Sequence, residues 1–189
     1  MSRFSPIRLL SLSAALVVTF PCCSEEAQEL EPNVRANGYF KAGKYEQAKL
    51  EYQKLVDRDP RDVEAITRLG LIWYEQGAPD RALHYLQKAK ELGPLDLDMG
   101  LRMASALLAT DQKSEGRVEA GRLLARSPSF DDALLLLAGA ADTEEIHLAI
   151  EQRIKKYKLE NGETATTHLA TAKLSLSEGD TRAASAAVN

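Results

Sequence analysis

The side chains that could carry covalent or metal chemistry in this 189-residue chain are two adjacent thiols and three histidines. Cys22 and Cys23 would suit nucleophilic attack, a disulfide or covalent attachment of lipid. The histidines, His84, His147 and His168, lie far apart, and none has a second ligand at the spacing of a metal site. These residues therefore predict neither a catalytic triad nor a metal centre.

Paired acids offer a second kind of chemistry, general acid–base catalysis. They occur at positions 131–132 and 144–145, each at the start of an expected helix, where a carboxylate interacts favourably with the helix dipole. Gly38 and Gly43 fall at small-residue positions of a helix hairpin and form no phosphate-binding loop. We expect no enzyme, no cofactor and no small-molecule substrate.

Cys22 and Cys23 lie at the end of an N-terminal leader. Arg3 and Arg8 precede an apolar run at residues 9–20, which is shorter than the roughly 20 residues of a membrane span. This pattern predicts a secretory signal over residues 1–22, with a buried core helix as the alternative.

A disulfide is not expected, because adjacent cysteines seldom pair and the chain has no other thiol. The end of the leader resembles a bacterial lipobox. The resemblance implies a lipid on Cys23, which follows Phe20 by three positions; Cys22, preceded by Pro21, is the other possibility. It also implies a membrane anchor in the bacterial cell envelope, and Ser24 favours a periplasm-facing outer-membrane lipoprotein.

The charge of the chain is acidic. Loss of Arg3 and Arg8 with the leader would change the formal net charge from −4 to −6. The basic cluster at residues 153–158 is expected to be a solvated helix face, so the sequence indicates no nucleic-acid partner.

The segment between the leader and the repeats, residues 23–30, is expected to be an acidic tether. Alternatively, it forms the first turns of a helix in which Pro32 suits position N1.

Small residues and prolines recur every 34 residues, which indicates a repeat architecture. Each of these sets shares one position of the period: Ala36, Gly70, Ala104, Ala138 and Ala172; Gly43, Gly77 and Gly179; Ala48, Ala82 and Gly116; Pro60, Pro94 and Pro128. In the fourth copy the third position holds Ile150, with Ala149 one place early, which leaves the geometry of that copy open.

Within one period, apolar spacing predicts two helices, at residues 62–76 and 80–92. Gly77 suits a left-handed C-cap between them, and Pro79 suits the start of the second helix. Prolines 60 and 94 end the second helices, because proline disfavours helix in the residue before it. No β-strand is expected.

Leu69, Gly70, Tyr74 and Gly77, followed by Ala82, Leu86, Ala89 and Pro94, resemble the signature of the tetratricopeptide repeat (TPR), a 34-residue helix-turn-helix unit. The resemblance implies an all-α solenoid of antiparallel hairpins over residues 31–189, with about four repeats and an incomplete fifth. The expected repeats are about 29–62, 63–96, 97–130, 131–164 and 165–189.

The family implies that first helices line a concave groove for a protein or peptide partner. Its usual groove positions fall on Asn33, Asn37, Lys41, Glu64, Thr67, Leu71, Tyr74, Glu75, Asp98, Leu101, Ser105 and Leu108. This mildly acidic set predicts a preference for apolar or basic segments. Alternatively, Tyr74 and Leu101 pack between neighbouring helices.

Two functions of different class follow. One is a non-enzymatic scaffold or adaptor of the bacterial envelope, tethered by lipid, which resembles TPR lipoproteins of exopolysaccharide production and exosortase-type protein sorting. The other is the N-terminal, substrate-recruiting part of a larger enzyme, since the fifth copy stops inside its second helix and the chain reads as truncated.

Overall fold

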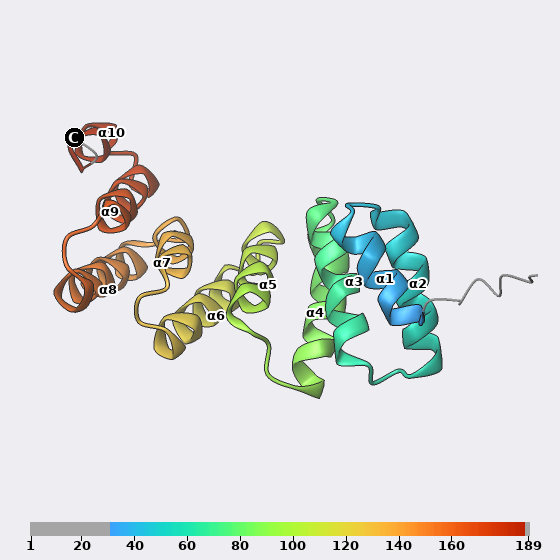
Figure 1. Cartoon of the computed structure of the whole chain (residues 1–189). Coiled ribbons are helices and arrows are strands. Elements are labelled where there is room, and N and C mark those ends of the chain that lie inside the picture. Colours follow the sequence, from blue (N-terminus) through green and yellow to red (C-terminus); the bar gives the residue numbers. More distant parts are fainter. Residues whose placement is uncertain (1–30, 188–189) are drawn as a thin grey trace, which may run out of the picture. The chain divides into compact units, whose positions relative to one another are not determined.

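The computed structural model describes residues 31–187, and all regular structure in this range is helical. The expected leader, the tether at 23–30 and Cys23 lie outside the described residues. The helices follow one another in a row (Figure 1): α1 (Pro32–Lys41), α2 (Tyr45–Arg58), α3 (Val63–Glu75), α4 (Pro79–Leu92), α5 (Leu97–Ala109), α6 (Lys113–Arg126), α7 (Asp131–Ala138), α8 (Glu144–Asn161), α9 (Ala165–Ser177) and α10 (Thr181–Ala187).

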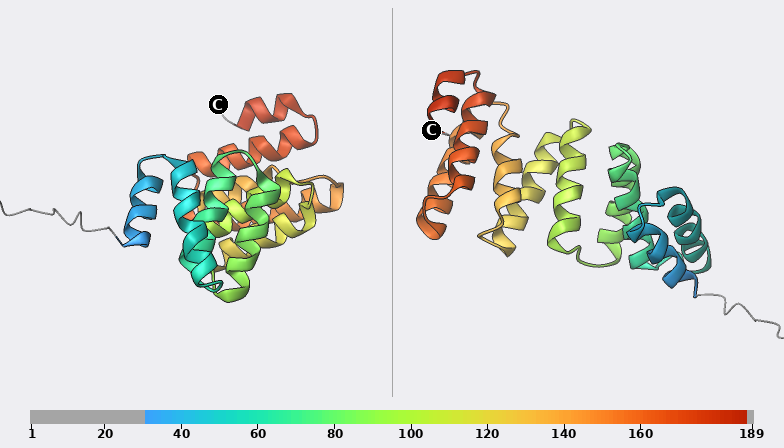
Figure 2. Two further views of the ribbon diagram at one scale, coloured as in Figure 1. Left: turned by 90° about the vertical axis from the view of Figure 1, so that its right-hand side faces the viewer. Right: turned by 45° about the horizontal axis from the view of Figure 1, so that its top comes forward.

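Consecutive helices form hairpins, which we call modules. The most extensive contacts join α3 to α4, α5 to α6, α1 to α2 and α9 to α10, and each hairpin also packs on the next one along the chain. The right-hand view of Figure 2 shows this succession of helix pairs. The expected all-α solenoid is therefore confirmed.

A small residue lies at the helix crossing of the first three modules. Ala36 and Ala104 are fully buried, and Gly70 is buried against Leu86 of α4. A Cβ atom added to Gly70 would lie 2.8 Å from Leu86 Cγ. Gly116 shows the same restriction from the other helix, because its Cβ would lie 2.7 Å from Leu108 Cδ2. Close approach of the two helices in the second and third modules therefore depends on glycine, which has no side chain, at positions 70 and 116.

The turn inside the first, second, third and fifth modules repeats as well. Gly43, Gly77, Asp111 and Gly179 have left-handed φ angles of 68°, 70°, 62° and 80° and occupy one position of the period. After α3, the Gly77 amide donates to Tyr74 O and the Ala78 amide to Trp73 O, which is a Schellman motif. The expected C-cap at Gly77 and helix starts at Pro32 and Pro79 are confirmed.

The fourth module departs from this geometry. Helix α7 has 8 residues, whereas α3, α5 and α9 have 13, and α8 begins at Glu144, before the position that the period assigns to it. Ile150, where other modules carry alanine or glycine, is buried. A large side chain thus occupies the position of the close crossing, and α7 contacts α6 and α9 more extensively than it contacts α8.

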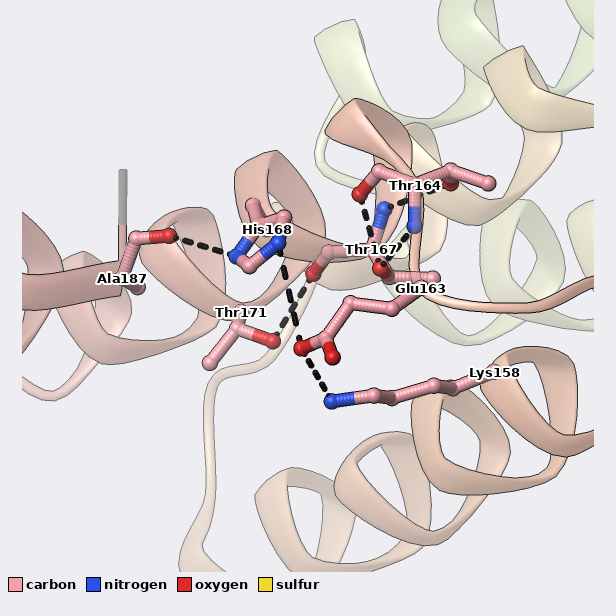
Figure 3. A network of polar contacts seen from close by, with 7 residues as sticks. All are labelled: Lys158, Glu163, Thr164, Thr167, His168, Thr171 and Ala187. Carbon is pink, nitrogen blue, oxygen red and sulfur yellow. Dashed lines mark hydrogen bonds and ion pairs between the residues drawn. The ribbon is translucent and has the colours of Figure 1, made fainter. Parts of the chain in front are cut away.

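The fifth module is held by polar contacts at the start of α9 (Figure 3). Thr164 and Thr167 form a capping box, with each hydroxyl accepting from the other residue's backbone amide. Glu163 pairs with Lys158 of α8, and His168 Nδ1 lies 3.0 Å from the carbonyl oxygen of Ala187 in α10. These contacts join three successive helices. Within residues 31–187, no helix combines the length and apolarity that crossing a membrane requires.

We predict that Gly70→Ala destabilises the protein by about 1–3 kcal/mol, because the new Cβ overpacks Leu86 although alanine favours helix. Gly38→Ala is the matched control, since a Cβ there meets no atom within 4 Å. It should stabilise the protein by about 0.5–1 kcal/mol. Urea unfolding measures both, and equal shifts of the two midpoints would contradict the role of the crossing.

Candidate functional site

The first helices of the first three modules, α1, α3 and α5, present the residues predicted to bind a partner; we call their exposed side the helix A surface. A cavity of about 450 Å³ lies between α3 and the start of α5. Glu64 and Thr67 line it, together with Arg68, Asp96 and Met99. Two of the predicted residues therefore share one concave site.

A hydrogen-bonded chain connects this site to the first module. The Tyr52 hydroxyl donates to Asn37 Oδ1 over 2.6 Å, and Asn37 Nδ2 donates to Glu64 Oε1 over 3.4 Å. Burial raises the pKa of Tyr52 to about 12, and the nearby Glu64 carboxylate adds to the effect while Arg68 opposes it. The amide of Asn37 is thus oriented by a phenol that keeps its proton.

A second cluster gathers around Arg102 of α5. Its guanidinium lies 2.7 Å from Glu75 Oε1 and 3.4 Å from Asp98 Oδ2, and 5.3 Å from the centre of the Tyr74 ring. Three predicted residues thus converge on one cation. Arg102 pairs with both acids and leaves this cluster with one net negative charge, so the acidity predicted for the groove is reduced here and is greater near Glu64.

The arginines were missed by sequence reasoning, although they repeat. Arg68 lies 5.0 Å from the centre of the Phe40 ring, and Arg102 lies over Tyr74; both the arginines and the rings are separated by one period. Each arginine also follows an acid by four positions, a spacing that pairs charges on a helix. That spacing was the available signal.

Two predicted groove residues belong to the packing between helices. Leu71 is 4% exposed and lies in the core of the first modules. Leu108 packs over Gly116 of α6. The assignment of Leu71 to the groove is wrong, because its side chain is buried in the core. Leu108 is half-buried, and it packs against the second helix of its own module.

The remaining predicted residues are at least partly accessible. Tyr74 and Leu101 are half-buried against the two core clusters, as the packing alternative predicted. Ser105 is also half-buried, and Asn33 and Lys41 are exposed on α1. In the described part of the chain, no group of three histidine, cysteine or acidic residues could hold a metal ion.

These features define a helical-repeat solenoid with a polar surface on its first helices. Residues 33–96 match the family model of the tetratricopeptide repeat, and the fold is that of a TPR protein. None of the curated proteins matches the chain in sequence.

Solved structures share the fold at low identity. MamA residues 41-end from Desulfovibrio magneticus RS-1 is 18% identical, with a TM-score of 0.68 over 82% of this chain and 88% of that one. YrrB, a TPR protein described as having an unusual peptide-binding site, is 14% identical, with a TM-score of 0.67 over 80% and 78% of the two chains. PilW, described as a type IV pilus biogenesis factor, is 20% identical, with a TM-score of 0.61 over 82% and 73%.

We predict that Tyr52→Phe lowers the free energy of unfolding by about 1 kcal/mol at pH 8, because the bond to Asn37 is lost. Above pH 10, where the tyrosines of the unfolded chain ionise, the raised pKa of Tyr52 means that its contribution falls as the pH rises toward 12. The difference between the wild type and Tyr52→Phe should therefore shrink between pH 8 and pH 11.

The measurement is urea unfolding at both pH values. It is made in a Tyr157→Phe background, because burial and the bond to Asp131 also raise the pKa of Tyr157 to about 12. A difference that is the same at both pH values would show that Tyr52 does not keep its proton preferentially in the folded state.

Proposed function

We propose that this protein is a non-enzymatic scaffold that binds a peptide segment of a partner protein on the helix A surface. The observation that carries the proposal is the cavity between α3 and the start of α5. TPR proteins use their first helices in this way, and YrrB is described as having a peptide-binding site.

The chemistry of the cavity indicates its ligand. Val63, Leu95 and Met99 supply an apolar lining, while the carboxylates of Glu64 and Asp96 are exposed at its edge. Arg68 contributes one positive charge, but it lies over Phe40. An apolar side chain next to a lysine or arginine in the ligand satisfies both parts of the cavity.

The test is selection of peptides from a random library with the full chain, followed by affinity measurements on one selected peptide. The selected peptides should pair an apolar residue with a neighbouring basic one. Reversing both charges, in Glu64→Arg with Asp96→Arg, should weaken binding roughly tenfold at low salt and less at high salt.

The matched control is Glu91→Arg, a charge reversal at an exposed position of α4 outside the cavity. It should leave the affinity unchanged. Equal effects of the two sets of substitutions, or a double variant with no salt-dependent loss, would overturn the proposed site.

We further propose that a lipid on Cys23 tethers the scaffold to a membrane of the bacterial envelope, where it serves exopolysaccharide or protein export. The leader with its terminal thiols supports this part of the proposal. The acidic residues after Cys23 would then separate the membrane from the repeats.

Labelling of bacterial cells with an alkyne-bearing fatty acid tests the tether. The wild type should incorporate label into the membrane fraction, Cys23→Ser should lose all of it, and the matched Cys22→Ser should retain it. Label that persists in Cys23→Ser and disappears in Cys22→Ser would assign the lipid to the other thiol, and no label in the wild type would remove the tether.

A further inference from the structure

A trough runs between the second helices of the third and fourth modules, α6 and α8, away from the cavity on the helix A surface. Two cavities make it up, of about 470 Å³ and 290 Å³, and Arg153 lines both. Along α6 it extends from Ser114 to Ala125, which corresponds to about 16 Å of helix, and Pro128 lines it just beyond the helix. This is where the fourth module departs from the period.

The larger cavity is apolar. Val118 and Gly121 of α6 line one wall, and Ile146, Ala149 and Ile150 of α8 line the other. Val118 is 54% exposed, and Ala149 is exposed as well. A groove between two helices that has an apolar lining accepts the apolar side of a third helix.

The charges that face the trough are predominantly positive. Arg117 is compensated by Asp142 at 3.0 Å, and Lys156 lies 3.6 Å from Glu160. Arg153, between the two cavities, makes no ion pair with any residue in the range 31–187. A carboxylate of a partner placed beside the apolar contacts would compensate it.

We propose that the trough is a second docking surface, which binds an acidic amphipathic helix of another protein. Apolar side chains of that helix, spaced by three and four residues, enter the larger cavity, and a glutamate or aspartate one or two turns away pairs with Arg153. The trough shares no lining residue with the cavity on the helix A surface, and its occupant carries the opposite charge to the ligand proposed there.

The probe is a fluorescein-labelled synthetic peptide of 16 residues with leucines on one helical face at one end and glutamates on that face at the other end. A matched peptide carries lysines in place of the glutamates. Fluorescence anisotropy with the full chain should show that the acidic peptide binds at least about tenfold more tightly, since a bidentate pair with Arg153 is replaced by repulsion.

Gly121→Leu is the main variant, because a Cβ at Gly121 meets no atom within 4 Å and the leucine can fill the trough without displacing the chain. It should weaken binding of the acidic peptide at least about tenfold. Arg153→Glu should do the same. Gly38→Leu, a matched change on α1 at an equally open glycine, should have no effect, and Glu64→Arg with Asp96→Arg should also leave this affinity unchanged.

Circular dichroism is measured on each variant, so that loss of binding is assigned only to chains that keep the helical spectrum. The proposal is overturned if the wild type does not bind the acidic peptide, if both peptides bind equally, or if Gly121→Leu binds like the wild type. A wild type that dimerises in sedimentation experiments while Gly121→Leu stays monomeric would overturn it too, because the occupant would then be a second copy.

Discussion

The structure depends on how closely two helices of one module can approach each other. Between α3 and α4 the approach is possible because residue 70 has no side chain, and Leu86 occupies the space that a Cβ would need. Gly116 has the same role toward Leu108, one module later and from the opposite helix. Since a buried interior is packed to crystal-like density, a single methyl group at such a crossing must displace a neighbour. Small residues at this crossing thus allow the same hairpin to recur in the first three modules, and the repetition places equivalent side chains of successive modules next to each other.

The surfaces of the protein follow from that repetition and from its interruption. Where the crossing is kept, the first helices stand in register, so that Arg68 reaches the ring of Phe40 and Arg102 reaches the ring of Tyr74 in the preceding module. Where it is lost, at Ile150, α7 is short and α8 starts early. The helix A surface belongs to the regular part, and the trough between α6 and α8 belongs to the irregular part. The two surfaces consequently differ in chemistry, one with exposed carboxylates and one with an uncompensated arginine.

The sequence was sufficient to predict features with a local physical cause. The left-handed conformation at Gly77 depends on the backbone freedom of glycine, and the helix start at Pro79 depends on the fixed φ angle of proline. The period of 34 made the hairpins predictable. The shape of the fourth module was not predictable, because it depends on whether α8 can still cross α7 when a large residue occupies the contact. The contact of Arg102 with Glu75 and the burial of Leu71 depend on how one module packs on the next, which periodicity within a module does not describe.

Native-state hydrogen exchange on the full chain tests the central claim directly, because it reports the free energy of opening of each helix pair separately. If a small residue at the crossing stabilises each module, the amides of α3 and α4 exchange only through the opening reaction with the largest free energy. The amides of α7, which has lost the close crossing with α8, exchange through an opening reaction with a smaller free energy. Equal protection of the two modules, or slower exchange in α7 than in α3, would contradict the account.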